Sequence, residues 1–480
     1  MPTVPTALLR WLLVCAVSVA PCARAAPALP VAVRAALAHA GVPASALAAV
    51  VGEAGGGRPL LQWQADRPMQ PASLTKLVTT AAALDLLGPG WRWHTPVWMQ
   101  GPLEHGVLHG SVFIRGSGDP SLVQERVWLL LQRLREAGVR RIDGDIVLDE
   151  SAFELPPIAP DAFDGEPLRP YNVRPAALLL NFRSRLYTFT PDPLRGVARV
   201  RVEPALDTSP MERTVPLSDG PCVDWRGALA ARFAADGTRF AGRYPASCGE
   251  QSWAVADPEP ASFDARLLAT LWHGMGGELV GRVREGRAPE GAAPSFDWVS
   301  PPLAEVVRDI NKYSNDLMAE QLALTLPLAL RGAAPATPES ARRMLTDWLA
   351  ERTGAAEAAA AFIENGSGLS RRTRLSAAQL AAVLGWAWRS PLMSELMSSL
   401  PIPGVDGTLR HDERMGRTAH LKTGSLRDVV GLAGWVLADD GRRYRLVAIV
   451  NDAHAQAARP ALDALVRWTA RRARSQRSAP

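Results

Sequence analysis

Cysteine is scarce in this sequence, and the four that occur, Cys15, Cys22, Cys222 and Cys248, form no C-x-x-C pair. There is also no H-E-x-x-H motif, and the eight histidines are scattered along the chain. Because zinc sites depend on such clustered ligands, we expect neither a metal ion nor another cofactor. No run of 18 uninterrupted apolar residues occurs, so the pattern predicts no membrane-spanning helix.

Neither sign of charge dominates the sequence. The chain has 53 lysines and arginines against 48 aspartates and glutamates, a net charge of +5. This weak excess argues against a nucleic-acid partner, which needs a strongly basic surface. With 47% hydrophobic and 21% charged residues the composition is that of a folded chain, and 480 residues predict two or three domains.

The N-terminus has the pattern of an export signal. Arg10 precedes an apolar run over 11–20, and Ala23-Arg24-Ala25 then supplies the small residues of a cleavage site. We expect residues 1–25 to be a signal peptide and the mature protein to be periplasmic, with a retained N-terminal anchor as the alternative. The arginines within 471–477 allow at most a peripheral membrane contact, and a solvated chain end is the simpler interpretation.

Removal of that signal would leave two cysteines, Cys222 and Cys248, which are 26 positions apart. In an exported chain such a pair predicts one disulfide, because the compartment is oxidising. Two buried thiols are the alternative.

Hydrophobic patterning predicts strands near both ends of the mature chain, at 46–53, 60–64, 421–425, 429–437 and 444–451, with helices between them. This order indicates an α/β (α+β) fold in which one antiparallel sheet is built from both ends and flanked by helices. The middle of the chain would be inserted. We therefore predict a catalytic domain from 26–97 and 295–480, an inserted α/β domain from 98–185 and 250–294, and a β-rich subdomain at 186–249.

Three short motifs carry the chemistry. Ser73 and Lys76 share one face of a predicted helix, where an amine can take the proton of a hydroxyl nucleophile. On its own this pair is common by chance, and a helix cap beside a solvated lysine would explain it. A K-T-G sequence, Lys422-Thr423-Gly424-Ser425, lies on a predicted strand, and Ser314-Asn315-Asp316 lies at a helix start between the other two motifs. The three in this order resemble the motif set of serine β-lactamases and penicillin-binding proteins.

Within that group the sequence resembles the D-alanyl-D-alanine carboxypeptidase/endopeptidase family, the class C low-molecular-weight penicillin-binding proteins. The 238 positions between Lys76 and Ser314 leave room for the large insertion of this family. The stretches GSGDPSL (116–122), NGSGL (365–369) and VDGTL (405–409) also look like the family. The resemblance implies an exported serine DD-peptidase that acts on peptidoglycan stem peptides and is inhibited covalently by β-lactams.

The resemblance also implies roles for the motif residues. Ser73 would attack the carbonyl between two D-alanines while Lys76 accepts its proton, and Ser314 would relay a proton to the leaving amine. Lys422 would supply positive charge for the terminal carboxylate of the substrate.

The remaining roles fall on the strand of the third motif. The Thr423 hydroxyl would assist Lys422, and Gly424 would let the substrate backbone approach closely. The backbone N–H groups of Ser73 and Ser425 would form the oxyanion hole.

Asp316 departs from the family pattern, which has asparagine at this position. A carboxylate only accepts hydrogen bonds, and Asp316 could hold Lys76 as an ammonium and so weaken it as a base. This favours, as one alternative function, a catalytically weak protein that binds peptidoglycan. A β-lactamase is the other alternative, although no motif assigns a deacylating base.

Overall fold

The computed structural model describes residues 28–206, 211–332, 335–354 and 360–471. The expected signal peptide, 1–25, and the arginines beyond Arg471 lie outside these ranges. None of the helices in the described ranges is both long and apolar enough to cross a membrane.

The central sheet has five strands, all antiparallel to their neighbours, and is made from both ends of the described chain, as the sequence predicted. Its order is β19 (Ala419–Leu426), β20 (Val429–Leu437), β21 (Arg443–Asn451), β1 (Leu47–Glu53) and β2 (Leu61–Trp63). Successive side chains point to opposite faces, so Ala48 and Val50 enter one hydrophobic core while Ala49 and Val51 enter another. Both faces of this sheet are therefore covered.

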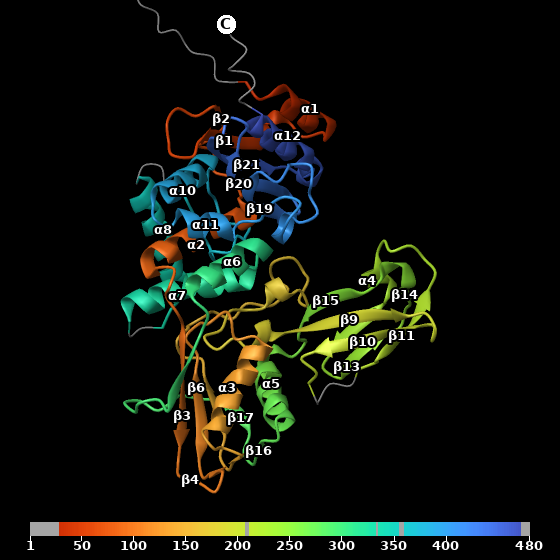
Figure 1. Cartoon of the computed structure of the whole chain (residues 1–480), viewed down its shortest axis with the longest axis vertical. Coiled ribbons are helices and arrows are strands. Elements are labelled where there is room, and N and C mark those ends of the chain that lie inside the picture. The colour runs from red at the N-terminus through yellow and green to blue at the C-terminus, as the bar shows by residue number, and fades with distance from the viewer. Residues whose placement is uncertain (1–27, 207–210, 333–334, 355–359, 472–480) are drawn as a thin grey trace, which may run out of the picture.

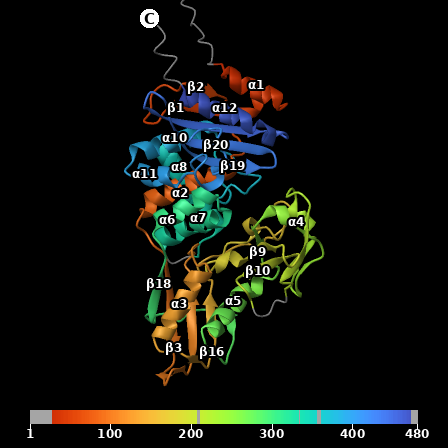
Figure 2. The ribbon, with the colours of Figure 1, turned by 45° about the vertical axis from the view of Figure 1, so that its right-hand side comes forward.

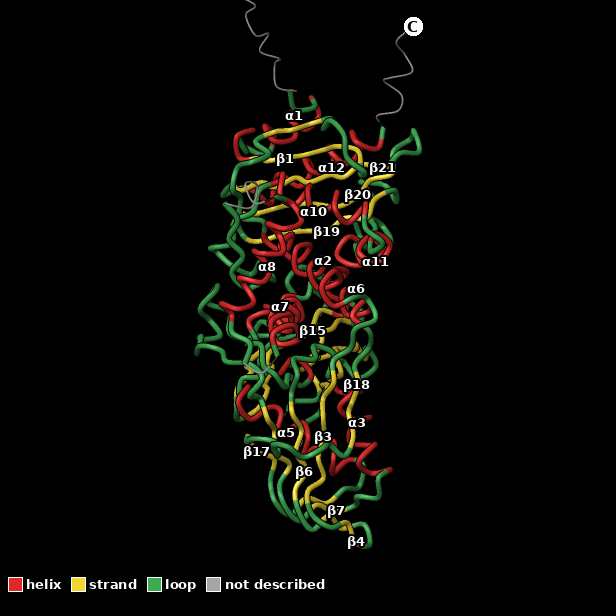
Figure 3. The backbone as a smooth tube through the Cα atoms, turned by 90° about the vertical axis from the view of Figure 1, so that its left-hand side faces the viewer, coloured by secondary structure: helices red, strands yellow, loops and turns green. Residues whose placement is uncertain are grey.

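Helices cover the sheet in two layers (Figure 1). One face carries α1 (Val31–His39) and α12 (Arg459–Ala470), and the other carries α2 (Thr75–Leu87), α8 (Pro338–Thr353) and α10 (Ala377–Arg389). Beyond that second layer lie α6 (Leu303–Tyr313), α7 (Asp316–Arg331) and α11 (Met393–Ser399). Seen from the side, α6 and α7 stand between this helix-covered sheet and the inserted region (Figure 3).

The inserted α/β region contains two small sheets and two helices. The larger sheet has the order β17 (Val283–Glu285), β8 (Ile146–Asp149), β6 (Ser111–Arg115), β3 (His94–Gln100) and β18 (Phe296–Val299). The smaller has the order β16 (Glu278–Leu279), β7 (Arg141–Ile142), β5 (Val107–Leu108) and β4 (Leu103–Glu104), and the helices are α3 (Gln124–Glu136) and α5 (Pro260–Gly274). Since β3 and β18 pair with each other, the region extends from 94 to 299, so the predicted limits at 98 and 294 are displaced by a few residues.

A β-rich unit lies within that insertion and projects sideways from it, away from the central sheet (Figures 1 and 2). Its main sheet has the order β14 (Tyr244–Pro245), β11 (Thr214–Ser218), β10 (Val197–Glu203), β9 (Ser184–Asp192) and β15 (Gln251–Ala256). A hairpin of β12 (Ala231–Ala234) and β13 (Gly237–Phe240) and the short α4 (Trp225–Ala228) complete the unit. Because β15 pairs with β9, the unit runs from 184 to 256, beyond the predicted 186–249. A disulfide joins Cys222 to Cys248 inside it.

Candidate active site

The first motif lies where a short turn leads into α2. Ser73 is in the 3-10 turn Ala72–Leu74, and Lys76 is in the first turn of the helix that follows. This spacing directs both side chains to one side, and Lys76 Nζ lies 2.9 Å from Ser73 Oγ.

Close backbone contacts hold that turn from two sides. A Cβ atom at Gly424 of β19 would lie 2.7 Å from the carbonyl oxygen of Pro71, and one at Gly368 would lie 1.9 Å from that of Ala72. Ala72 itself has a φ of 49°, a left-handed conformation that is uncommon outside glycine. Strain of this kind persists where the surrounding structure enforces it, here immediately before Ser73.

Lys76 is enclosed, with none of its side chain exposed. Its Nζ donates to Ser73 Oγ at 2.9 Å, to Asp316 Oδ1 at 2.6 Å and to the carbonyl oxygen of Ser367 at 2.7 Å. An ammonium has three N–H groups, and each has an acceptor here. The structure thus places the Asp316 carboxylate against the Lys76 amine, the contact that the sequence analysis considered for this position.

The middle motif lies at the junction of two helices. Ser314 ends α6 in a left-handed conformation, with φ 56° and ψ 38°. The Asn315 side chain then caps α7 by accepting from the backbone N–H of Met318 at 3.0 Å. Asn315 is thus used to begin a helix and does not replace the amide that Asp316 lacks.

Lys422 lies beneath this junction. Its Nζ donates to Ser314 Oγ at 2.9 Å and to the carbonyl oxygen of Thr423 at 2.9 Å, and the residue is fully buried. Burial and the nearby Lys76 lower the pKa of Lys422 well below its ordinary value, which Asp316 only partly offsets. From the sequence, Lys422 was expected to supply positive charge for the substrate carboxylate; in the structure its ammonium is directed at Ser314.

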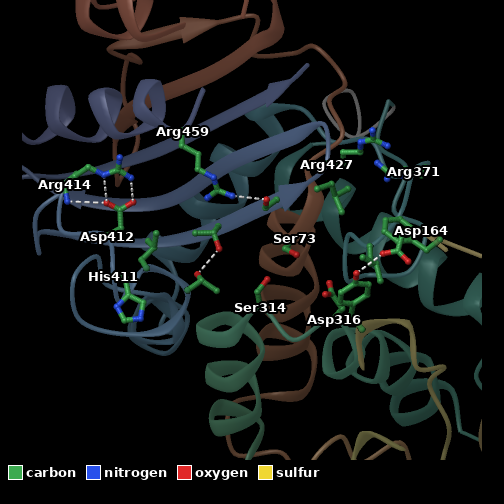
Figure 4. A pocket seen from close by; sticks show the side chains of 18 residues that line it. Ser73, Asp164, Ser314, Asp316, Arg371, His411, Asp412, Arg414, Arg427 and Arg459 are labelled. Atoms are coloured by element: carbon green, nitrogen blue, oxygen red, sulfur yellow. Dashed lines mark hydrogen bonds and ion pairs between the residues drawn. The ribbon is translucent and has the colours of Figure 1, made fainter. Parts of the chain in front are cut away.

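A cleft of about 820 Å³ opens above these groups, and Ser73, Ser314, Asp316, Thr423 and Ser425 all line it. Figure 4 shows Ser73 and Ser314 at its centre. The inserted region contributes Phe163, Asp164 and Tyr171 to one side, and the arginines 414 and 459 lie on the other. The structure thus brings the three motifs of the sequence together around one nucleophile, with both lysines below the surface.

Comparison with known proteins agrees with this geometry. The family model of D-Ala-D-Ala carboxypeptidase 3 (S13) matches residues 30–472. The chain belongs to the S13 family. It is accordingly a serine-type carboxypeptidase, as the sequence predicted.

This S13 chain is also similar to individual relatives and to solved structures. It is 27% identical over 439 residues to the D-alanyl-D-alanine carboxypeptidase of Actinomadura sp. (strain R39), covering 84% of this chain and 77% of the relative. To the carboxypeptidase DacB of Haemophilus influenzae it is 24% identical over 407 residues, 80% of each chain. The crystal structure of penicillin binding protein 4 (dacB) from H. influenzae has the same fold, with a TM-score of 0.68 at 21% identity over 88% of this chain and 96% of that one.

Two groups of residues next to the cleft were not identified from the sequence. In the 365–369 stretch, Asn365 Nδ2 and Ser367 Oγ donate to Glu320 Oε1 at 2.7 and 2.9 Å. Burial raises the pKa of Glu320 to about 8, although the bond from Ser367 opposes this shift. These contacts hold the loop whose Ser367 carbonyl binds Lys76.

The second group is in the 405–409 stretch. Lys312 of α6 donates to Asp406 Oδ2 and to the carbonyl oxygen of Leu400, both at 2.6 Å. Two residues on, Thr408 Oγ1 lies 2.8 Å from Thr423 Oγ1 at the cleft. The likeness of both stretches to the family was the available signal, but their partners lie far away in the sequence. Among the described residues there is no cluster of histidine, cysteine and acidic side chains suited to a metal ion.

Proposed function

We propose that the protein is an exported serine DD-peptidase that forms an acyl-enzyme on Ser73. It would hydrolyse terminal D-Ala-D-Ala bonds as a carboxypeptidase, D-Ala-diamino-acid crosslinks of peptidoglycan as an endopeptidase, or both. The observation that carries this proposal is the pair of serine–lysine contacts at the cleft, Ser73 with Lys76 and Ser314 with Lys422, each 2.9 Å long.

In the proposed reaction Ser73 Oγ forms a bond to the carbonyl carbon while its proton passes to Lys76, which must first have lost one of its own. The carbonyl electrons move onto oxygen, stabilised by the backbone N–H groups of Ser73 and Ser425. When the C–N bond breaks, Ser314 relays a proton to the leaving amine. Water then hydrolyses the ester and regenerates the Ser73 hydroxyl.

Lys422 has an indirect part in this scheme. A lysine whose pKa is lowered gives up its proton more readily than a free lysine, and the Lys422 Nζ is bonded to the Ser314 hydroxyl. We therefore assign Lys422 to the relay through Ser314.

The size of the cleft and its second wall favour substrates longer than a dipeptide, which supports the endopeptidase proposal. A relative in fold, Bd3459 from Bdellovibrio bacteriovorus, is described as a predatory peptidoglycan endopeptidase, with a TM-score of 0.50 at 16% identity over 84% of this chain and 86% of that one. A β-lactam complex has been described for the H. influenzae penicillin binding protein 4. We propose the same class of covalent inhibitor for this protein.

Export to the periplasm is proposed on two grounds. One is the signal-like pattern of residues 1–25, and the other is the Cys222–Cys248 disulfide, a bond that persists in oxidising compartments. Recovery of the mature protein from a periplasmic fraction, with an N-terminus at Ala26, would support the proposal. Retention of residues 1–25 in the cell would contradict it.

A second candidate, a peptidoglycan-binding protein with weak catalysis, is favoured by the 2.6 Å contact between Asp316 and Lys76. To separate the two, the mature protein would be incubated with a stem pentapeptide and with a crosslinked dimer, using Ser73→Ala as the control. Release of D-alanine or of monomers by the wild type alone supports the peptidase. Binding without turnover supports the second candidate, and rapid destruction of penicillin would instead indicate a β-lactamase.

A further inference from the structure

The leaving D-alanine of a DD-peptidase substrate carries a carboxylate one carbon from the nitrogen that is released. A desolvated carboxylate needs a positively charged partner or several hydrogen-bond donors. Since the Lys422 ammonium is fully buried and bonded to Ser314, a positive charge in direct contact with this carboxylate would have to come from the cleft surface.

Arg459 stands on this surface beside the third motif. It is the first residue of α12, and its Nη2 donates to Ser425 Oγ at 3.1 Å (Figure 4). Thr423 and Ser425 are two apart on β19, so both side chains face the cleft, and both line it together with Arg459.

A neighbouring glutamine, Gln456, fixes the position of this guanidinium. Gln456 Oε1 accepts from Arg459 Nη2 at 2.8 Å and from its Nε at 3.2 Å. Gln456 Nε2 in turn donates to the carbonyl oxygens of Val429, at 2.9 Å, and Leu426. The arginine is thereby tied to the β19–β20 turn, although its side chain is on the exposed surface.

The guanidinium has donors left over. A guanidinium has five N–H groups, and the bonds to Gln456 and Ser425 use those of Nε and Nη2. Within the described ranges, Nη1 has no protein acceptor, and no carboxylate oxygen lies within 4.0 Å of Arg459. The nearby Arg414 differs, because its guanidinium lies 3.4 Å from both Asp412 and Asp463.

We propose that Arg459, acting with the Thr423 and Ser425 hydroxyls, binds the carboxylate next to the scissile amide nitrogen. The ligand class is a D-amino acid carboxylate on the leaving side, or the carboxylate of a β-lactam. This inference rests on the proposed function. Arg459 makes the enzyme selective for free carboxylates over amides and esters, whereas Lys422 acts equally on all of them through Ser314.

The test compares Arg459→Gln with wild type on an N-acylated D-Ala-D-Ala peptide and on the C-terminal amide of the same peptide. We expect kcat/KM to fall at least about tenfold on the free acid and less than about threefold on the amide. Arg459→Lys, which keeps the charge but loses the forked geometry, should lie between the two. Penicillin and its methyl ester provide a second pair, read as acylation rates.

Arg467→Gln is the matched control, because it removes the same charge from α12 without lining the cleft, and it should leave both ratios unchanged. Equal losses of Arg459→Gln on acid and amide, or on penicillin and its ester, would overturn the inference while leaving the proposed function intact. A wild-type protein that neither hydrolyses the peptides nor is acylated would overturn the proposed function itself, and the inference with it.

Discussion

At the scale of single residues, the 2.6 Å contact between Lys76 and Asp316 bears directly on the proposed activation of Ser73. The base must be neutral to accept a proton, and an adjacent carboxylate stabilises the charged form. An asparagine would offer the same oxygen acceptor without the negative charge. We therefore expect Asp316 to slow the proposed step in which Lys76 accepts the Ser73 proton.

Asp316→Asn should accelerate acylation by penicillin at pH 7 by about tenfold or more, because it keeps an oxygen acceptor for Lys76 and removes the negative charge that favours the ammonium; a tenfold rise corresponds to a barrier lower by about 1.4 kcal/mol. Stopped-flow acylation of both proteins at pH 7 would measure the difference. A variant with an unchanged rate would show that the pair does not limit the reaction.

Glu320 is the second residue at which pH should matter. Its pKa is raised from 4.5 to about 8, chiefly by burial, so the folded state keeps a proton that the unfolded chain has lost. Between these two values the folded state binds one more proton, and its stability falls as pH rises. Glu320→Gln should therefore flatten the decline in melting temperature between pH 5 and 8 and still accept from Ser367 and Asn365.

Thermal unfolding across that range, with the exposed Glu136→Gln as control, would test this expectation. The control should follow the wild-type slope. If Glu320→Gln does so as well, the carboxyl is ionised in the folded protein and the expectation is wrong.

Sequence patterns identify which residues form the site more reliably than they predict where the side chains of those residues point. Spacing on a helix predicts that Ser73 and Lys76 share a face, because both are in one turn. Nothing local tells that Lys422 is directed to Ser314, since that depends on how β19 packs against the α6–α7 junction. The same applies to Arg459, which approaches Ser425 from a helix 34 positions later.

At the scale of elements, the site depends on the α6–α7 junction and on the loop that carries Thr408. Lys312 joins them, because it is on α6, next to the junction, and binds Asp406 two residues before Thr408. Only 5% of the Lys312 side chain is exposed, against 33% for Asp406. Loss of the carboxylate would leave a nearly buried ammonium without an ionised partner among the described residues.

Asp406→Asn should lower the free energy of unfolding by about 1–3 kcal/mol, less than for a fully buried pair because Asp406 is partly exposed. The acylation rate should fall too, since a weaker bond to Lys312 would hold Thr408 less firmly against Thr423. Urea unfolding and penicillin labelling measure the two effects. The control Glu339→Gln removes an exposed ion pair with Arg342 on α8 and should change neither quantity. If Asp406→Asn behaves like this control, the Lys312–Asp406 pair does not support the site.

At the scale of the whole molecule, the catalytic sheet was predictable because four of its five strands have seven to nine mostly buried residues and lie near the chain ends. The limits of the insertion were harder to predict, since they depend on pairing between distant strands. His94–Gln100 pairs with Phe296–Val299, and Ser184–Asp192 with Gln251–Ala256, so each boundary strand is completed by a partner far along the chain. Alternation within one strand does not reveal such a partner.

The β-rich unit, which projects away from the central sheet, should contribute to stability and not to the chemistry. Its disulfide closes a loop across 26 positions. By restricting the unfolded chain, a loop of this size raises the free energy of unfolding by about 3 kcal/mol. Replacing Cys222 and Cys248 together by serine should therefore lower the stability of this unit and make it sensitive to protease. The rate of penicillin acylation at Ser73 should stay within about twofold of wild type, because the sheet and helices that carry Ser73 are separate from the unit. Limited proteolysis and acylation kinetics on the same preparation would measure the two effects. A large loss of acylation in a variant that resists protease as well as the wild type does would show that the β-rich unit acts on the catalytic cleft.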